Sequence, residues 1–181
     1  MRILLLFLII VTLPLLLGGC DRLSMIGKEP VTETKPELEG VNYFELEERK
    51  GITCIKGSYS PYTGKAYKFY ENGQKQVETN IKDGKRDGPE TQWHENGQKQ
   101  FEINLKDGKP EGLATWWSEN GQKEKEINYE DGKYEGLGTF WHENGQKQVE
   151  ANFKDGKLIS RKFWNSKGEP VNSREEAESE K

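Results

Sequence analysis

Four glutamates recur every 24 residues, at Glu78, Glu102, Glu126 and Glu150, and carboxylates in register could act as an acid–base pair. If each lies on every second strand of a sheet, neighbours are about 10 Å apart, because strands are spaced by about 4.8 Å. That separation is larger than the distance between the two catalytic carboxylates of a retaining glycosidase. It lies at the upper limit of the distance found in inverting glycosidases. Since Lys and Gln flank these positions, a solvated sheet face is the simpler interpretation.

The other candidates for chemistry are equally dispersed. His94 and His142 occupy equivalent positions two repeats apart, about 19 Å by strand spacing, so they cannot share a metal ion or a proton relay. The Asp-Gly-Lys segments lack the alternating acids of a calcium loop and are typical of turns. We therefore expect no catalytic residue, no metal site and no cofactor, and we predict a protein that is not an enzyme.

The N-terminus, residues 1–19, has the form of an export signal: a basic start, then about 15 apolar residues, where a spanning helix needs roughly 20. The sequence Leu17-Gly18-Gly19-Cys20 resembles the bacterial lipobox. The resemblance implies cleavage before Cys20 and lipidation of its thiol. Asp21 is similar to an inner-membrane retention signal of enterobacterial lipoproteins. An uncleaved anchor or a signal peptide without lipidation is the alternative.

Cys54 would be the one thiol left once Cys20 is lipidated, so it could form no disulfide within the chain. A small buried hydrophobic residue is the simpler interpretation of Cys54. In an oxidising compartment, a mixed disulfide with a partner or a disulfide-linked dimer is the alternative.

Composition limits the fold and the partners. Of 181 residues, 32% are apolar and 32% are charged, which allows only a thin apolar layer, and the net charge of -4 is interleaved rather than gathered in a basic stripe. A nucleic-acid partner is therefore not expected. Residues 20–40 are predicted to be the lipidated Cys and a flexible tether. Residues 169–181 are predicted to be a disordered acidic tail, with a frayed helix from Ser173 as the alternative.

Two motifs position all of these residues. Glu-Asn-Gly-Gln-Lys begins at Glu71, Glu95, Glu119 and Glu143, and Asp-Gly-Lys keeps the same 24-residue period. A period this short indicates one supersecondary unit stacked on copies of itself. Strand-like runs precede and follow each Glu-Asn-Gly; in the second run, apolar residues alternate with Glu and Asn.

The predicted fold is therefore all-β: an elongated single sheet of tandem 24-residue hairpins over residues 41–168. We expect Asn-Gly to form a two-residue type I′ turn and Asp-Gly-Lys to open a longer connection that ends at Gly88, Gly112 or Gly136. The segments 41–46 and 52–55 are predicted to pair as a hairpin that caps one sheet edge. Residues 161–164 are expected to cap the other.

An aromatic column lies two residues before each motif and continues after the last one: Phe69, Trp93, Trp117, Trp141 and, one residue early, Trp164. Three other aromatic residues depart from it. Trp116, Phe140 and Phe163 lie one position from the column, so they should point to the opposite face. Exposed aromatic residues with polar neighbours are typical of contact patches. We predict these three residues, with His142 beside them, as partner-contact residues, unless a curled sheet or the tail covers them.

The pattern of Glu-Asn-Gly-Gln-Lys, an alternating run, Asp-Gly-Lys and a following Gly resembles the MORN-repeat-variant family, whose bacterial members include YwqK-type antitoxins. The resemblance covers roughly residues 60–168. It implies a stacked-hairpin sheet that contacts proteins or lipids, and it implies no catalytic residues. We expect a lipoprotein on the cell membrane, facing the periplasm or exterior, that binds a protein partner of the envelope. An antitoxin or immunity protein that neutralises a specific toxin is the alternative.

Overall fold

The computed structural model describes residues 40–179. The predicted signal peptide 1–19, the lipidation site Cys20 and the tether up to residue 39 lie outside the described residues. Within residues 40–179, no helix is both long enough and apolar enough to cross a membrane.

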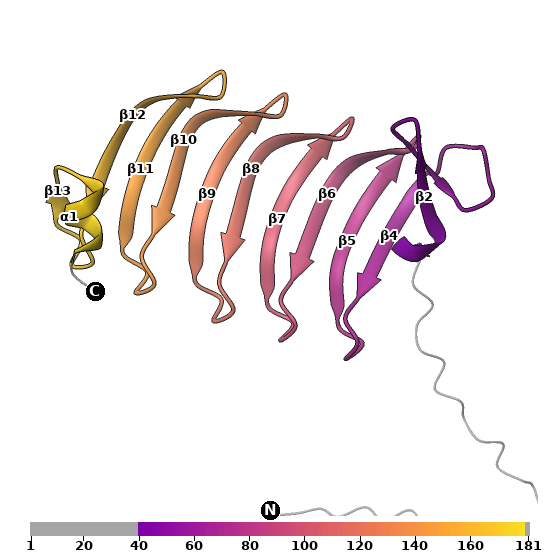
Figure 1. Ribbon diagram of the computed structural model, residues 1–181, viewed down its shortest axis with the longest axis horizontal. Coiled ribbons are helices and arrows are strands. Elements are labelled where there is room, and N and C mark those ends of the chain that lie inside the picture. Colours follow the sequence, from indigo (N-terminus) through magenta and orange to yellow (C-terminus); the bar gives the residue numbers. More distant parts are fainter. Residues whose placement is uncertain (1–39, 180–181) are drawn as a thin grey trace, which may run out of the picture. The chain divides into compact units, whose positions relative to one another are not determined.

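Eleven strands form one sheet whose spatial order follows the chain (Figure 1). All neighbouring strands are antiparallel except β1 and β4, which are parallel. The prediction of an all-β, elongated sheet of tandem hairpins is confirmed. The strands are β1 (Val41–Asn42), β4 (Gly64–Phe69), β5 (Lys75–Lys82), β6 (Lys85–Trp93), β7 (Lys99–Lys106), β8 (Lys109–Trp117), β9 (Lys123–Glu130), β10 (Lys133–Trp141), β11 (Lys147–Lys154), β12 (Lys157–Trp164) and β13 (Pro170–Val171).

The predicted turn types are exchanged in the structure. Asp83 and Gly84 both have positive φ, at 50° and 77°, and Lys82 pairs with Lys85 across them, so Asp-Gly is the two-residue turn. In the Glu-Asn-Gly segments only the glycine has positive φ, for example Gly73 at 83°. The Tyr70 N–H donates to the Gln74 carbonyl around it, as in a type I turn followed by a left-handed glycine. Asn therefore has another role, described below.

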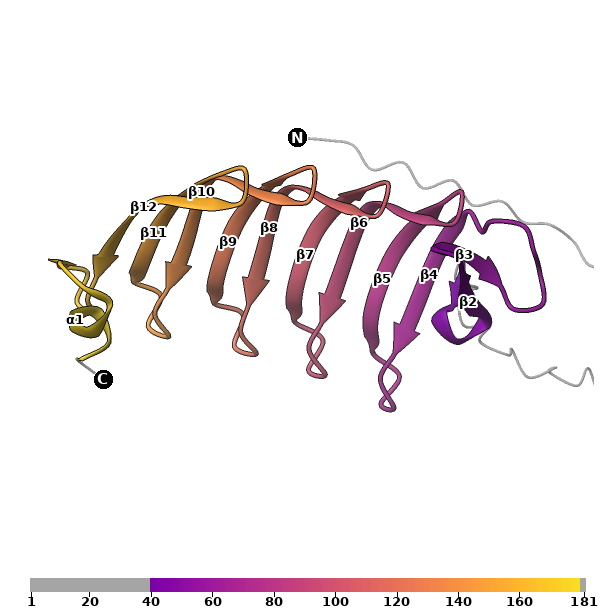
Figure 2. The ribbon, with the colours of Figure 1, turned by 45° about the horizontal axis from the view of Figure 1, so that its top comes forward.

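The glycines that were expected to end a long connection instead lie inside strands. Gly88, Gly112 and Gly136 have φ of 105°, 75° and 71°, and the pairing register of each hairpin shifts beside them. Extra residues on one strand bend it, because they have no counterpart on its neighbour. Figures 1 and 2 show β6, β8, β10 and β12 turning sharply near their starts.

Cross-strand partners define two faces of the sheet. On one, here the apolar face, an aromatic row crosses the strands near the Glu-Asn-Gly turns: Lys68, Val77, Gln92, Phe101, Trp116, Lys125, Phe140, Val149 and Phe163. The adjacent row is small or compact: Ala66, Thr79, Glu90, Ile103, Ala114, Ile127, Gly138 and Ala151.

Residues of this adjacent row are buried although the sheet is a single layer: Ala66, Thr79 and Ala114 are 0% exposed. The bend explains their burial, because it brings side chains of the flanking rows over them. Ile103, Leu105 and Ala114 accordingly form one cluster with Phe101, Trp116 and Tyr129. The core therefore lies inside the bend of a single sheet. A core this small is consistent with the low apolar content of the chain.

Both ends of the sheet are closed by short segments. A hairpin of β2 (Leu46–Arg49) and β3 (Ile52–Ile55) does form, but it is a separate two-stranded sheet. The expected strand 41–46 is wrong in its first part: β1 adds to β4, and a 3-10 helix, η1 (Tyr43–Glu45), follows it. Polar side chains explain this break, since Asn42 caps the turn by accepting from the Phe44 N–H.

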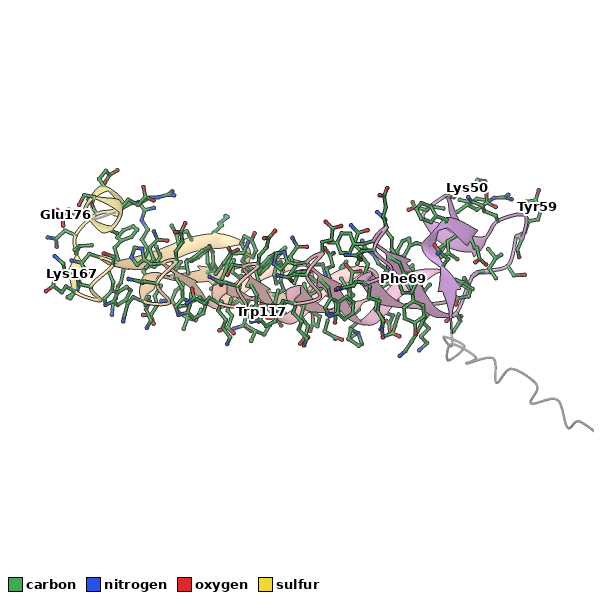
Figure 3. The ribbon with its side chains drawn as sticks, turned by 90° about the horizontal axis from the view of Figure 1, so that it is seen from below. Lys50, Tyr59, Phe69, Trp117, Lys167 and Glu176 are labelled. Carbon is green, nitrogen blue, oxygen red and sulfur yellow. The ribbon has the colours of Figure 1, made fainter. Side chains whose placement is uncertain are left out.

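At the other end, β12 is a full strand rather than a short cap. Within the predicted disordered tail, the structure has the two-residue strand β13 and the helix α1 (Arg174–Glu178), which begins after Ser173. Strands as short as β1 and β13 leave little unpaired backbone at an edge, which disfavours edge-to-edge association. In Figure 3 the segments that carry Lys50 and Glu176 rise on the same side of the sheet.

Candidate binding surface

The face opposite the apolar face, here the Trp–Glu face, carries the glutamates and the aromatic column. Each motif lysine binds the glutamate three residues later: Lys75 to Glu78 at 2.6 Å, and the equivalent pairs of Lys99, Lys123 and Lys147. The same lysines lie over rings of the aromatic column, with Lys147 Nζ 5.1 Å from the Trp164 ring centroid. These carboxylates act as lysine partners on a regular surface, and exposed ion pairs of this kind stabilise little.

The rim formed by the Glu-Asn-Gly turns joins each repeat to the next. The Tyr70 hydroxyl donates to the Trp93 carbonyl at 2.7 Å, and at the equivalent positions His94 Nε2 lies 2.8 Å from the Trp117 carbonyl oxygen. A carbonyl can only accept, so Nε2 of this histidine carries a proton. Ser118 holds the same position in the third repeat but bonds within its own turn, to Asn120 and Gln122.

Three of the four motif asparagines also join neighbouring turns. Asn96 accepts from the Gln98 N–H at 2.9 Å within its own turn and donates to the Glu119 carbonyl of the next turn at 2.7 Å. Asn72 and Asn144 make equivalent bonds. The recurrence of Asn in the motif is thus explained by its hydrogen bond to the next repeat rather than by a type I′ turn.

Hydrogen bonds also join neighbouring repeats along the opposite rim, which the Asp-Gly turns form. The Gly108 N–H donates to the Arg86 carbonyl at 2.7 Å, and the same bond recurs from Gly132 and Gly156. The acidic residue before each bulge glycine accepts from the Asp N–H of the next turn: Asp87 from Asp107, Glu111 from Asp131 and Glu135 from Asp155. Both motifs therefore serve the stacking of repeats, which leaves the faces free to vary.

The predicted contact residues do not form one patch. Trp116 and Phe140 lie in the aromatic row and are half-buried, and Phe163, at 8% exposed, is buried where β12 meets β13 and α1. His142 is on the rim and lies 2.9 Å from the Trp164 carbonyl, engaged as His94 is. The structure therefore places Trp116 and Phe140 in one row, on either side of Lys125, and keeps His142 in a hydrogen bond to the next strand.

The middle of the aromatic row is partly exposed. Phe101 and Trp116 rings pack at 4.7 Å between centroids, and Lys125 Nζ lies 3.7 Å from the Trp116 centroid. Desolvation lowers the pKa of Lys125. A hollow of about 370 Å³ adjoins these rings, lined by Gln92, Phe101 and Trp116 among others. Lys125 is a binding candidate that the sequence analysis did not single out, although it replaces Val77, Phe101 and Val149 of the other repeats.

One buried carboxylate also escaped the sequence analysis. Glu90, 4% exposed, occupies the position of Ala66, Ala114 and Gly138 in the other repeats. It accepts from the Thr79 hydroxyl, from Arg86 and from the Gln92 amide, at 3.1, 3.0 and 3.1 Å. Its hydrogen bonds are satisfied within the chain, so it is a structural group. Its departure from a small-residue row was the available signal.

Tyr129, Tyr134 and Phe153 form an aromatic cluster beside the Asp-Gly turns, with ring centroids 5.0 and 5.2 Å apart. Burial, together with the neighbouring Tyr134 hydroxyl, raises the pKa of Tyr129 to about 12. The three rings pack the bend.

The remaining candidates show no site. Cys54 is a free thiol, buried at 2% exposure in the small hairpin. Among residues 40–179, no group of three or more His, Cys, Asp or Glu side chains is placed to hold a metal ion.

Comparison with known families gives one match. The MORN repeat variant family matches four tandem segments, residues 62–83, 86–107, 110–131 and 134–155. Each segment spans one hairpin of the main sheet, from near the start of its first strand to the Asp of the Asp-Gly turn after its second. A search of curated proteins gave no match. MORN repeats suggest a protein-binding role, and the stacked sheet seen here is of the binding-module type.

Proposed function

We propose that this chain, a carrier of four tandem MORN repeat variants, is a non-enzymatic platform that binds a protein partner at the cell envelope. The observation that carries the proposal is the two partly exposed aromatic residues Trp116 and Phe140, which flank Lys125 in the middle of the apolar face. Buried aromatic anchors contribute most of the energy in protein interfaces, and hollows beside them admit a partner's side chains.

Coverage at the two ends of the same face supports this choice. Leu46 and Tyr43 pack on Ala66 and Ile81 at the N-terminal end, and Phe163 lies beneath segments from β13 and α1 at the other. The chain thus covers this face where the repeats end and leaves the centre half-exposed. On the Trp–Glu face, by contrast, the motif lysines and the glutamates bind each other.

The anchor is a separate part of the proposal. Lipidation at Cys20 would hold the platform on the membrane, with Asp21 favouring the inner membrane, because two or more acyl chains give stable attachment. Replacement of Cys20 by Ser should release the chain from membranes into the soluble fraction. Retention of the Ser variant in a carbonate-washed membrane pellet would contradict the lipid anchor and favour an uncleaved apolar segment.

The decisive test of binding is crosslinking and capture from membranes. The Trp116→Ala/Phe140→Ala variant should lose one dominant partner that the wild type captures. A matched control is Leu113→Ala/Leu137→Ala, which removes exposed apolar residues from the same two strands on the opposite face. Equal capture by the wild type and the Trp116/Phe140 variant would sink the platform proposal.

The captured partner's identity also decides between roles. A toxin whose activity is blocked on binding would make the chain an antitoxin or immunity protein, whereas an envelope component would make it a scaffold. An enzyme would instead require one of the face glutamates, so a hydrolytic activity lost in Glu102→Gln but kept in the Trp116 variant would contradict the non-enzymatic assignment.

A further inference from the structure

Lys125 departs from its repeat in a specific way. The equivalent positions carry Val77, Phe101 and Val149, so a cation replaces an apolar residue. Its direct cross-strand neighbours are Trp116 on one side and Phe140 on the other. A lysine between two aromatic residues places one positive charge at the centre of the proposed contact surface.

This charge has no carboxylate partner within residues 40–179. Lys125 makes no ion pair there, and its contact is with the Trp116 ring, at 3.7 Å from the centroid. The acidic side chain that acts on it electrostatically is Glu124, its chain neighbour. By contrast, the four motif lysines of the Trp–Glu face each bind a glutamate. A desolvated cation without a counter-ion is unfavourable unless a ligand supplies one.

Two other cations of the apolar face, Arg86 and Arg161, show how the chain itself supplies negative charge to such a cation. Arg86 donates to the buried Glu90 at 3.0 Å. Arg161 lies over the Phe163 ring at 5.2 Å, which repeats the arrangement of Lys125 over Trp116. The acidic helix α1 adjoins that second site, and Arg161 adds to the hydrogen bonds from the Glu175 backbone and Ser173 that lower the pKa of Glu175.

Helix α1 therefore indicates what kind of segment fits a cation over an aromatic ring on this face. It has three acidic residues in five, Glu175, Glu176 and Glu178, and its one apolar side chain, Ala177, is 2% exposed. The segment is short, acidic and amphipathic. The Trp116–Lys125 site likewise has a cation over an aromatic ring, with no such segment of residues 40–179 beside it.

We propose that the apolar face binds an acidic amphipathic segment of the partner protein, with a carboxylate on Lys125 and apolar side chains against Trp116 and Phe140. This inference rests on the proposed function and names the partner's chemistry. A lipid headgroup would need several cations in one place, and Lys125 stands alone between aromatic residues; the surface is suited to a peptide.

The probes are two synthetic peptides that differ in charge alone: an amphipathic helix with Glu on its polar face and its Gln twin. Binding to the full chain in detergent is measured by fluorescence anisotropy. The acidic peptide should bind at least roughly tenfold more tightly than its twin, as expected for a charge-assisted hydrogen bond. Lys125→Glu should abolish that preference, and Lys125→Arg should keep it.

Lys68→Glu is the matched control. Lys68 lies in the same row on β4, and its cross-strand neighbour is Val77 rather than an aromatic residue. Loss of the preference in both charge reversals would show a general effect of net charge and overturn the inference. So would equal binding of the two peptides.

The membrane capture experiment separates this inference from the proposed function. If Trp116→Ala/Phe140→Ala loses the partner while Lys125→Glu keeps it, the platform stands and the acidic-segment inference fails. If neither variant loses the partner, both fail. Lys125→Gln, which removes the charge and keeps a polar side chain, checks that any loss follows from charge rather than from unfolding, since its thermal melt should match the wild type.

Discussion

His142 Nε2 donates to the backbone carbonyl of Trp164 across a distance of 2.9 Å, so a side chain that sequence analysis assigned to partner contact joins the fourth repeat to β12, the strand that follows it. His94 makes the same bond to Trp117, and Tyr70 makes it to Trp93 with a hydroxyl. In solenoid proteins each repeat contacts only its neighbours, so such bonds contribute to the coupling that makes unfolding cooperative. His142 is accordingly expected to act on repeat stacking first.

The first prediction concerns this bond in the second repeat. His94→Ala should lower the free energy of unfolding by about 1 kcal/mol, because the Trp117 carbonyl loses its donor. Chemical denaturation followed by tryptophan fluorescence measures the change. Ser118→Ala is the control, since Ser118 holds the same position and bonds only within its own turn among the described contacts. Equal losses in both variants would show that the cross-repeat bond contributes nothing.

The hydrogen bonds between repeats along the two rims explain why the fold was predictable and the turn types were not. The 24-residue period and the alternation of the second strand are properties of the sequence, and they determine a stacked-hairpin sheet. The role of Asn is not local. Asn96 bonds to Glu119, one repeat away, and that contact exists only once two repeats are stacked. A local rule therefore assigned the type I′ turn to Asn-Gly, when Asp83 and Gly84 adopt it.

The candidate site shows a similar division. Alternation alone places Trp116 and Phe140 opposite the Trp column, and the cross-strand pairs agree. How much of each ring is covered depends on the bend at the bulge glycines and on α1, which buries the surroundings of Phe163. Lys125 was visible in the sequence as a break in an apolar column. Its role as a binding candidate could be inferred only from the structure, which places its amine over the Trp116 ring.

A second prediction concerns the buried Glu90. Glu90→Ala should destabilise the fold by about 1–3 kcal/mol, because the Thr79 hydroxyl, 0% exposed, loses its acceptor. Arg86 is half-exposed and can turn to water, so its loss adds less. The double variant Glu90→Ala/Thr79→Val removes the unsatisfied hydroxyl and should recover most of the loss. If the double variant is no more stable than Glu90→Ala, the hydrogen bond is not the cause.

The third prediction is a pH dependence. The pKa of Tyr129 is about 12 in the folded chain against an ordinary value of 10.0, so the unfolded chain loses this proton first as pH rises. The stabilisation is present below about pH 10 and is lost as pH rises toward about 12. Tyr129→Phe should weaken this decline in thermal stability. Tyrosinate absorbance of the two proteins should differ by one group that titrates late.

Tyr43 and Tyr62 also have raised pKa values because of burial, and they add to the decline in both proteins. The comparison therefore depends on the difference between wild type and Tyr129→Phe rather than on either curve alone. Identical pH profiles for the two would show that the cluster of Tyr129, Tyr134 and Phe153 does not hold the proton.

The fourth prediction uses two glycines in equivalent turns. Gly121 and Gly145 both have φ of 81°, so alanine at either position costs about 1–2 kcal/mol for the left-handed conformation. They differ in their surroundings: a Cβ at Gly121 would lie 2.6 Å from Gln98 Oε1, whereas at Gly145 it would meet nothing within 4 Å. Gly121→Ala should therefore cost more than Gly145→Ala by a few tenths of a kcal/mol, because a flexible side chain must move.

Removal of the obstructing amide makes this difference a test of repeat stacking. In a Gln98→Ala background, Gly121→Ala and Gly145→Ala should cost the same, since the conformational strain is all that remains. Denaturant midpoints of the four variants measure it. A difference that persists without Gln98 would mean that the turns of neighbouring repeats do not contact each other through this glutamine, and that the rim is held by Asn96 and His94 alone.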